Sequence, residues 1–415
     1  MQMSWELVIA AIIFTVTYAV ISLRRLPGIE VGMHTAALAG AALMLVFGIV
    51  SMSDAWHSLN LDVLFLLLGM MLLVGSLDAC GFFGIVANLL IHRVPNGRNL
   101  LVRVMVLSAV LSALMLNDAV VLLLTPAVIR CCMAMRANPI PYLIGVFVSA
   151  NIGSCATIVG NPQNAYIATR AGIGFMDFTA ELLPMSIACL IVSILLMLVL
   201  FRRRLGAEPS GPISEHIEDR MTLYAVVTIA IATIVMFTLS TSLDLELASI
   251  AMTGGCLALI VVSLKGLPVF TGVLRRVDWK VLLFFIGLFV IMAGAVSSGL
   301  VDRIASIFPG FSDGDPSMME LTVFTVLLSN LISNVPSVIL IGDMIGNASA
   351  SAWLVLSASS TLAGNLTMIG AAANVIVSEE AEKEGIRLDF RKYLATGIPV
   401  SLVTLAVMYV LLVLL

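Results

Sequence analysis

Long apolar runs separated by short polar connections fill most of the chain. A helix that spans the hydrocarbon core of a bilayer needs about 20 mostly apolar residues, and ten segments of this kind can be read from the sequence. They cover residues 5–23, 31–50, 61–77, 141–169, 182–201, 221–239, 245–264, 281–297, 352–377 and 393–415. The pattern predicts an all-α integral membrane protein with about ten transmembrane helices.

Two further apolar stretches, residues 100–135 and 321–345, are interrupted midway by polar residues. The first carries Asn117 and Asp118 at its centre, and the second carries the sequence SNVPS. Each is long enough for two short helical arms but not for two full crossings. We therefore expect two re-entrant helical hairpins whose polar tips end inside the membrane, which requires protein or a water-filled cavity around each tip.

The two halves of the sequence share residues at nearly constant spacing. Gly69 recurs as Gly287, 218 residues later, and Asn164 recurs as Asn374, 210 residues later. Other such pairs are Gly81 with Gly299, Ser112 with Ser329, Asn117 with Asn334, Thr157 with Thr367, and Gly160 with Gly370. The polar segment 206–220 separates a first repeat, residues 1–205, from a second, residues 221–415. Five spans per repeat, an odd number, predict that the second repeat is inverted in the membrane.

Positive charge tests this inverted topology, because Lys and Arg gather in cytoplasmic loops. With both termini outside and the linker inside, all but Arg170 and Arg303 of the 21 Lys and Arg residues fall on the cytoplasmic side. The sequence therefore predicts a multi-pass protein of the inner (plasma) membrane.

Composition excludes several other classes of protein. Hydrophobic residues make up 60% of the chain and charged residues 11%, whereas soluble domains carry roughly 25% charged residues. The net charge of -4 provides no basic surface for nucleic acid. The four histidines and six cysteines have no metal-ligand or disulfide spacing. We expect no metal site, no cofactor and no enzymatic activity.

Four interruptions of the apolar pattern carry polar side chains into the membrane. Two are the hairpin tips, and two lie in the spans that follow them, at residues 151–164 and 363–374. Gly and Pro release backbone N–H and C=O groups from the helix. Asn, Ser and Thr supply side-chain donors and acceptors for a small hydrophilic solute. The N-termini of half-helices add positive dipole ends. Close packing of membrane helices can account for the presence of one isolated small or polar residue. It does not account for four breaks that match between the two halves. The candidate solute- or ion-binding residues are Asn117, Asp118, Asn151, Thr157, Asn161, Asn164, Ser333, Asn334, Ser337, Asn365, Thr367 and Asn374.

Asp118 is the acidic residue within these breaks. A carboxylate inside the membrane is costly unless it is protonated or paired, so Asp118 is a candidate for H⁺ or Na⁺ coupling. The corresponding residue of the second repeat is Val335, so the two halves are not chemically equivalent. A coupling Na⁺ is expected near Asn117, Asp118 and Asn164.

Three other polar side chains, of Asp343, Asp78 and Cys155, each have an expected location or role. Asp343 is expected nearer the external water, and Asp78, at a helix end, is expected to have a structural role. Cys155 lies within a break and is a candidate for substrate contact.

These motifs resemble those of the ArsB/NhaD permease superfamily, which groups arsenite efflux pumps, sodium/proton antiporters, divalent-anion and citrate transporters, and an anion permease branch that includes plant silicic acid exporters. The resemblance covers nearly the whole chain. GNPQN is most similar to the anion permease branch, and the Asn-Asp and Asn-Val-Pro tips are similar to those of the arsenite pumps. The other stretches that carry it are LFLLLGMMLLVGSLDACGFF and LAGNLTMIGAAANVIVSEEAEKEG. The resemblance implies a homodimer and alternating access by a transport domain that moves against a scaffold.

The resemblance and the charges together indicate a substrate class. Dicarboxylate transporters have Ser-Asn-Thr at both tips, where this chain has Leu-Asn-Asp and Ser-Asn-Val. An ionised Asp118 repels a dianion, and no Lys or Arg falls in the breaks. We expect an H⁺- or Na⁺-coupled secondary transporter that exports a small inorganic oxyacid such as arsenite, antimonite or silicic acid. The alternatives are a permease for another anion (sulfate, citrate or a dicarboxylate), a Na⁺/H⁺ antiporter, and a passive channel.

Overall fold

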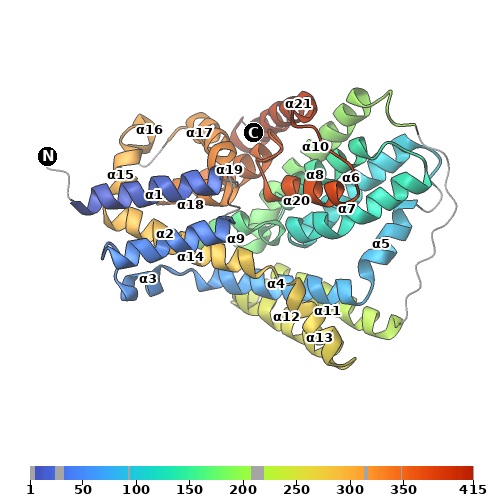
Figure 1. Cartoon of the computed structure of the whole chain (residues 1–415), viewed down its shortest axis with the longest axis horizontal. Coiled ribbons are helices and arrows are strands. Elements are labelled where there is room, and N and C mark those ends of the chain that lie inside the picture. The colour runs from blue at the N-terminus through green and yellow to red at the C-terminus, as the bar shows by residue number, and fades with distance from the viewer. Residues whose placement is uncertain are drawn as a thin grey trace.

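The computed structural model describes residues 5–23, 32–91, 94–206, 219–312, 316–346 and 348–414. Within these ranges every regular element is a helix (Figure 1), which confirms the predicted all-α class. Residues 207–218 of the predicted linker lie outside the described part of the chain, as do Arg24, Arg25 and Arg93, which belong to the charge argument.

Eight helices of the described part of the chain are long and apolar enough to cross a membrane. They are α1 (Trp5–Leu23), α4 (Leu61–Ala79), α6 (Gly97–Leu114), α7 (Asn117–Ala134), α10 (Phe175–Leu200), α11 (Arg220–Leu243), α14 (Trp279–Ser297), and α21 (Phe390–Tyr409) with the following turn η2 (Val410–Leu414).

The remaining helices are shorter. Six of 12 to 17 residues are apolar: α2 (Met33–Val46), α8 (Pro139–Ser154), α12 (Leu247–Ser263), α17 (Met318–Ile332), α18 (Asn334–Ile345) and α19 (Ala350–Ala363). The others are α3 (Met52–Ser58), α5 (Phe82–Ile91), η1 (Ile158–Gly160), α9 (Pro162–Ala171), α13 (Leu267–Arg276), α15 (Leu300–Ala305), α16 (Pro309–Ser312) and α20 (Ala372–Lys383).

The two predicted hairpins differ in the length of their arms. α17 and α18 have 15 and 12 residues, as expected for short arms. α6 and α7 have 18 residues each, or about 27 Å, close to the thickness of the hydrocarbon core. The arms of the first hairpin are therefore longer than the short arms that the sequence predicts. The reason is local: the Asn96 side chain accepts a hydrogen bond from the backbone N–H of Asn99 and starts α6 before the apolar stretch begins.

The two broken spans are interrupted as the sequence predicts. Predicted span 141–169 divides into α8, the single turn η1 and α9, and predicted span 352–377 divides into α19 and α20. The order of the spans, hairpin arms and broken spans recurs in the second half of the chain. The first series is α1, α2, α4, α6, α7, α8, α9 and α10, and the second is α11, α12, α14, α17, α18, α19, α20 and α21.

Two close helix crossings join the halves of the chain. α4 packs against α12, and α14 packs against α2. A Cβ atom on Gly69 of α4 would lie 2.3 Å from the backbone of Ala251 in α12, and one on Gly287 of α14 would lie 2.6 Å from the backbone of Ala37 in α2. Such close approach requires residues without a side chain. Two glycines that recur in the sequence therefore lie at two corresponding crossings.

Gly69→Val should lower the melting temperature because the added side chain forces α4 and α12 apart, and overpacking of this kind costs about 1–3 kcal/mol. Gly206→Val is the matched control, since a Cβ atom there meets nothing within 4 Å. Thermal unfolding of both variants in the same detergent checks this expectation. Equal melting temperatures would contradict the assigned crossing.

Ion pairs fasten helix ends to one another. Arg276 Nε lies 2.6 Å from Asp78 Oδ2 and ties α13 to the end of α4, which is the structural role expected for Asp78. Lys265 Nζ lies 2.9 Å from Asp219 Oδ2, next to the start of α11. The hydrogen bonds that Lys265 and Thr222 donate hold the pKa of Asp219 well below its ordinary value.

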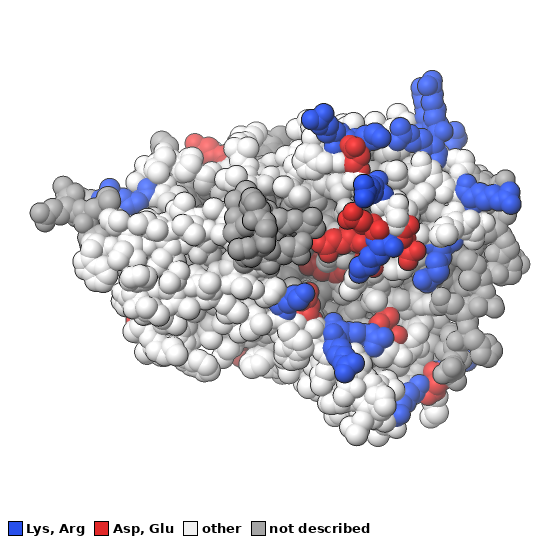
Figure 2. All heavy atoms as spheres, viewed as in Figure 1, with Lys and Arg blue, Asp and Glu red and all other residues white. Residues whose placement is uncertain are grey.

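Charged side chains gather over one part of the visible surface (Figure 2), and much of the rest of that face is uncharged. Many of the longest helices present large apolar side chains outward, including Ile191 and Val199 of α10, Ile231 of α11 and Leu402 of α21. A broad surface of exposed apolar side chains suits a protein surrounded by lipid.

Candidate functional site

A cavity of about 70 Å³ lies where both hairpin tips meet both broken spans. This volume accommodates more than one water molecule. The predicted residues Asn117, Asp118, Ser333 and Asn334 line the cavity, so residues far apart in the sequence come together here. Its other lining residues are Met33, Pro162, Gln163, Val281, Phe284, Phe285, Val335, Ala371 and Ala372.

Four helix N-termini converge on this cavity. α7 begins at Asn117, α9 at Pro162, α18 at Asn334 and α20 at Ala372, and each of these residues lines the cavity. Helix N-termini carry about half a positive charge and direct free N–H groups outward. In α7, α18 and α20 no side chain caps these groups. The cavity can therefore stabilise an oxyanion or hydroxyl oxygens, although no Lys or Arg among the described residues lines it.

Ser333 holds the second hairpin tip in a strained backbone conformation. Its φ of 82° and ψ of 160° fall in a region that is essentially restricted to glycine, at a cost of about 1–3 kcal/mol. Strain of this kind persists at sites where the surrounding structure fixes the backbone for a function.

Ser333→Gly should raise the melting temperature by a few degrees, because glycine adopts this conformation without strain. Ser333→Ala keeps the strained backbone and should not gain stability, so it is the control. Thermal unfolding of the two variants separates strain from loss of the hydroxyl. A Gly variant no more stable than the Ala variant would contradict the expectation.

Asn151 of α8 connects the two halves of the chain through side-chain amides. Its Nδ2 donates to Oδ1 of Asn365 and to Oδ1 of Asn374, each at 2.9 Å. Its Oδ1 accepts a 3.4 Å hydrogen bond from Nδ2 of Asn117 at the first tip. Asn117 lines the cavity, and its Oδ1 is buried and accepts no hydrogen bond from the described residues.

The second tip is held by a different set of bonds. The Asn334 amide has both its groups satisfied when Nδ2 faces the carbonyl oxygens of Ser360 and Gly370, 3.1 Å from each. Ser337 Oγ lies 2.8 Å from Ser329 Oγ on the other arm. These contacts fix the tip against the end of α19 and the break that follows it.

Asn164 and Asn374 make the same pair of hydrogen bonds in their own halves. Nδ2 of Asn164 donates to the carbonyls of Ser154 and Thr157, at 3.0 and 2.9 Å. Nδ2 of Asn374 donates to the carbonyls of Gly364 and Thr367, at 2.7 and 3.0 Å. These two residues follow Ser154 and Thr157 by 210 positions. Asn164 Oδ1 accepts from Ser357 at 2.7 Å, so its amide is fully used within the protein. Asn164 shapes the break and does not line the cavity with Asn117 and Asp118.

The remaining predicted residues donate hydrogen bonds to one backbone carbonyl and to two side chains near the breaks. Thr157 Oγ1 donates to the carbonyl of Ala113 at 2.5 Å, and Thr367 Oγ1 donates to Asn330 Oδ1 at 2.9 Å. Asn161 Nδ2 donates to Thr361 Oγ1 at 3.3 Å.

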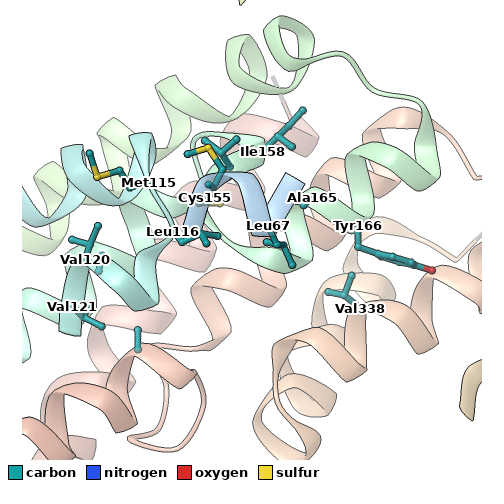
Figure 3. Packing of buried hydrophobic residues seen from close by; sticks show 14 of the residues in the cluster. Leu67, Met115, Leu116, Val120, Val121, Cys155, Ile158, Ala165, Tyr166 and Val338 are labelled. Atoms are coloured by element: carbon teal, nitrogen blue, oxygen red, sulfur yellow. The ribbon is translucent and has the colours of Figure 1, made fainter. Parts of the chain in front are cut away.

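Cys155 lies away from these polar groups. It is completely buried in a cluster of apolar side chains that includes Met115 and Ile158 (Figure 3). It does not line the cavity, so the expected contact with substrate has no support in this geometry.

Sequence reasoning missed several polar residues of the site. Gln163 lines the cavity and stands within the GNPQN motif, which was its only signal. Tyr393 donates to the backbone carbonyl of Asn365 at 2.5 Å, and Asn330 binds the carbonyl of Ala363 at 3.0 Å. Neither Tyr393 nor Asn330 lies in an interruption of the apolar pattern, so no sequence signal could have selected them.

The class of this helical membrane protein follows from its relatives, which are transporters and not enzymes. The model of the citrate transporter family (CitMHS) matches residues 9–354. The chain belongs to this family, within the predicted superfamily.

Known proteins are similar over nearly the whole chain. The silicon efflux transporter LSI3 of Oryza sativa subsp. japonica is 30% identical, over 97% of this chain and 96% of that protein. The transporter arsB of Dictyostelium discoideum is 25% identical, over 96% of this chain and 90% of that protein. The YdaH transporter of Alcanivorax borkumensis has a similar fold, with a TM-score of 0.55 and 17% identity over 98% of this chain and 97% of that one.

Proposed function

We propose that this protein is an H⁺- or Na⁺-coupled secondary transporter that exports a small inorganic oxyacid or its anion by alternating access. The observation that carries the proposal is the cavity of about 70 Å³ between the two tips. Its uncapped helix N-termini and side-chain amides suit the oxygens of such a solute. Asp118, which also lines it, supplies the carboxylate for a coupling cation.

The relatives support an oxyacid. One is named a silicon efflux transporter and another arsB. Silicic and arsenous acids are uncharged near neutral pH and present hydroxyl groups, so they can bind beside Asp118 without the repulsion that a dianion meets. The citrate transporter family model makes a carboxylate substrate the second candidate, for which the four helix N-termini would replace Lys or Arg.

A panel of flux assays on reconstituted protein tests the proposal. Arsenite, silicate, sulfate, citrate and Na⁺ are each measured with and without a proton gradient. We expect concentrative, gradient-dependent transport of arsenite or silicate. Concentrative citrate or sulfate transport would favour the anion permease, Na⁺ movement alone would favour an antiporter, and strictly downhill flux would favour a channel.

The proposal includes a membrane arrangement: two inverted repeats, two re-entrant hairpins, both termini outside, and a homodimer in the inner (plasma) membrane. It is supported by the distribution of Lys and Arg in the sequence and by the matching hydrogen bonds of Asn164 and Asn374. Chemical crosslinking in membranes tests the dimer.

Cysteine labelling checks the orientation. A cysteine at Ser210 should react with a membrane-impermeant reagent only from the cytoplasmic side, and one at Asp313 only from the outside, because an odd number of crossings separates them. Labelling of both positions from the same side would contradict the inverted arrangement. The native cysteines are replaced by serine first, so that each signal comes from one position.

A further inference from the structure

A groove lies where the end of α10 meets the start of α21, and it shares no lining residue with the cavity between the two tips. It consists of two cavities, of about 280 and 680 Å³, that share the lining residues Phe201, Arg204 and Lys392. The larger cavity also contains Arg202 and Arg203. We call this feature the α10–α21 groove.

The α10–α21 groove concentrates positive charge. Arg202, Arg203, Arg204 and Lys392 are exposed, and none of them takes part in an ion pair with a carboxylate of the described residues. The acid that lines it, Asp389, caps α21 by accepting the backbone N–H of Lys392 at 2.9 Å. A fifth cation, Arg387, lines the smaller cavity and lies 4.0 Å from Glu382. Five cations against one lining acid give the groove a net positive charge, which is complementary to an anion.

Apolar surface adjoins these cations. Val199 and Leu200 of α10 line the larger cavity with Ala395 of α21. Val199 is 64% exposed, and Leu195, one turn earlier on the same helix, is 58% exposed. A small soluble anion gains no binding free energy from contact with this apolar surface. A phospholipid can place its acyl chains along the surface and its phosphate among the cations.

We propose that the α10–α21 groove binds an anionic phospholipid, with the headgroup phosphate between Arg202, Arg203, Arg204 and Lys392 and the acyl chains along the apolar faces of α10 and α21. Basic pockets between transmembrane helices on the cytoplasmic side bind such headgroups. The membrane orientation proposed above places the groove in the cytoplasmic leaflet. The site is independent of the transported solute.

Mass spectrometry of the intact protein tests the proposal after reconstitution in phosphatidylcholine vesicles that contain 20% phosphatidylglycerol and gentle extraction. Wild-type protein should retain phosphatidylglycerol. The variant R202Q/R203Q/R204Q/K392Q should retain at least about tenfold less. The control R98Q/R220Q/R275Q/K280Q removes four exposed cations outside the groove and should retain as much as wild type.

Two further measurements test the proposal. Ala395→Trp leaves every charge in place but fills the groove, and it should also displace phosphatidylglycerol. Inorganic phosphate should neither displace the lipid nor raise the melting temperature as phosphatidylglycerol does. Equal retention by the groove variant and the control, undiminished retention by Ala395→Trp, or equal stabilisation by free phosphate would each overturn the proposal.

Discussion

Asp118→Asn should abolish ion-driven transport while the protein remains folded. The asparagine is nearly the same size but cannot carry the negative charge that binds Na⁺ or releases a proton, so the gradient no longer drives the solute. We expect concentrative transport to fall about 100-fold, in line with the loss of a hydrogen bond or ion contact to a charged group. Solute flux with an imposed proton or Na⁺ gradient, and then without one, measures this effect.

Asp343→Asn is the matched control for this variant. Asp343 is an acid of the other hairpin, on α18, and does not line the cavity. It should retain gradient-dependent transport. Normal gradient dependence in Asp118→Asn, or an equal loss in both variants, would refute the coupling role of Asp118. The melting temperature of each variant separates loss of coupling from loss of fold.

Asn117→Ala should weaken solute binding by about tenfold, the value of one neutral hydrogen bond in a buried site. Asn334→Ala should weaken it to a similar extent, because the second tip loses the hydrogen bonds that hold it beside the cavity. The double variant should show no measurable binding, because it removes the amides of both tips from the cavity. Solute-dependent thermal shifts or equilibrium binding to the purified variants measure the affinities.

The two variants are expected to differ in stability. Asn334→Ala also loses contacts with the carbonyls of Ser360 and Gly370 and should melt at a lower temperature, whereas Asn117→Ala loses one long bond, to Asn151. Asn99→Ala, at an exposed position near the start of α6, is the control and should bind normally. Unchanged affinity in both tip variants would remove the hairpin tips from the site.

Features that depend on spacing along the chain could be predicted from the sequence. Apolar length identified the long helices, and Gly, Pro and Asn in the spans 141–169 and 352–377 identified their breaks. The recurrence of Asn117 as Asn334 placed one amide at each tip. These are local signals, since each requires only that the chain stay in a membrane or leave a helix.

Features that depend on which helices touch could not be predicted in the same way. Asn151 has no asparagine at the matching position of the second half, which is Thr361, and its bonds to Asn365 and Asn374 cross between the halves. Cys155 lies in a polar break but faces apolar neighbours, because a break contains residues of both orientations. Short helices such as α13 were missed because ten residues are too few for a span, although Pro268 in its first turn is a signal for a helix start.

The two glycine crossings have a mechanical consequence. α4 of the first half is interlocked with α12 of the second, and α14 with α2, while α7 packs on α20 and α9 on α18. Neither half of the sequence can therefore move past the other as a unit. Alternating access, as proposed above, would then require a movement along a plane that cuts both halves in the same way, with the tightly crossed helices α2, α4, α12 and α14 as the stationary part. The hairpin arms and the broken spans of both halves would then move together as one rigid body. Asp118 would move with that body.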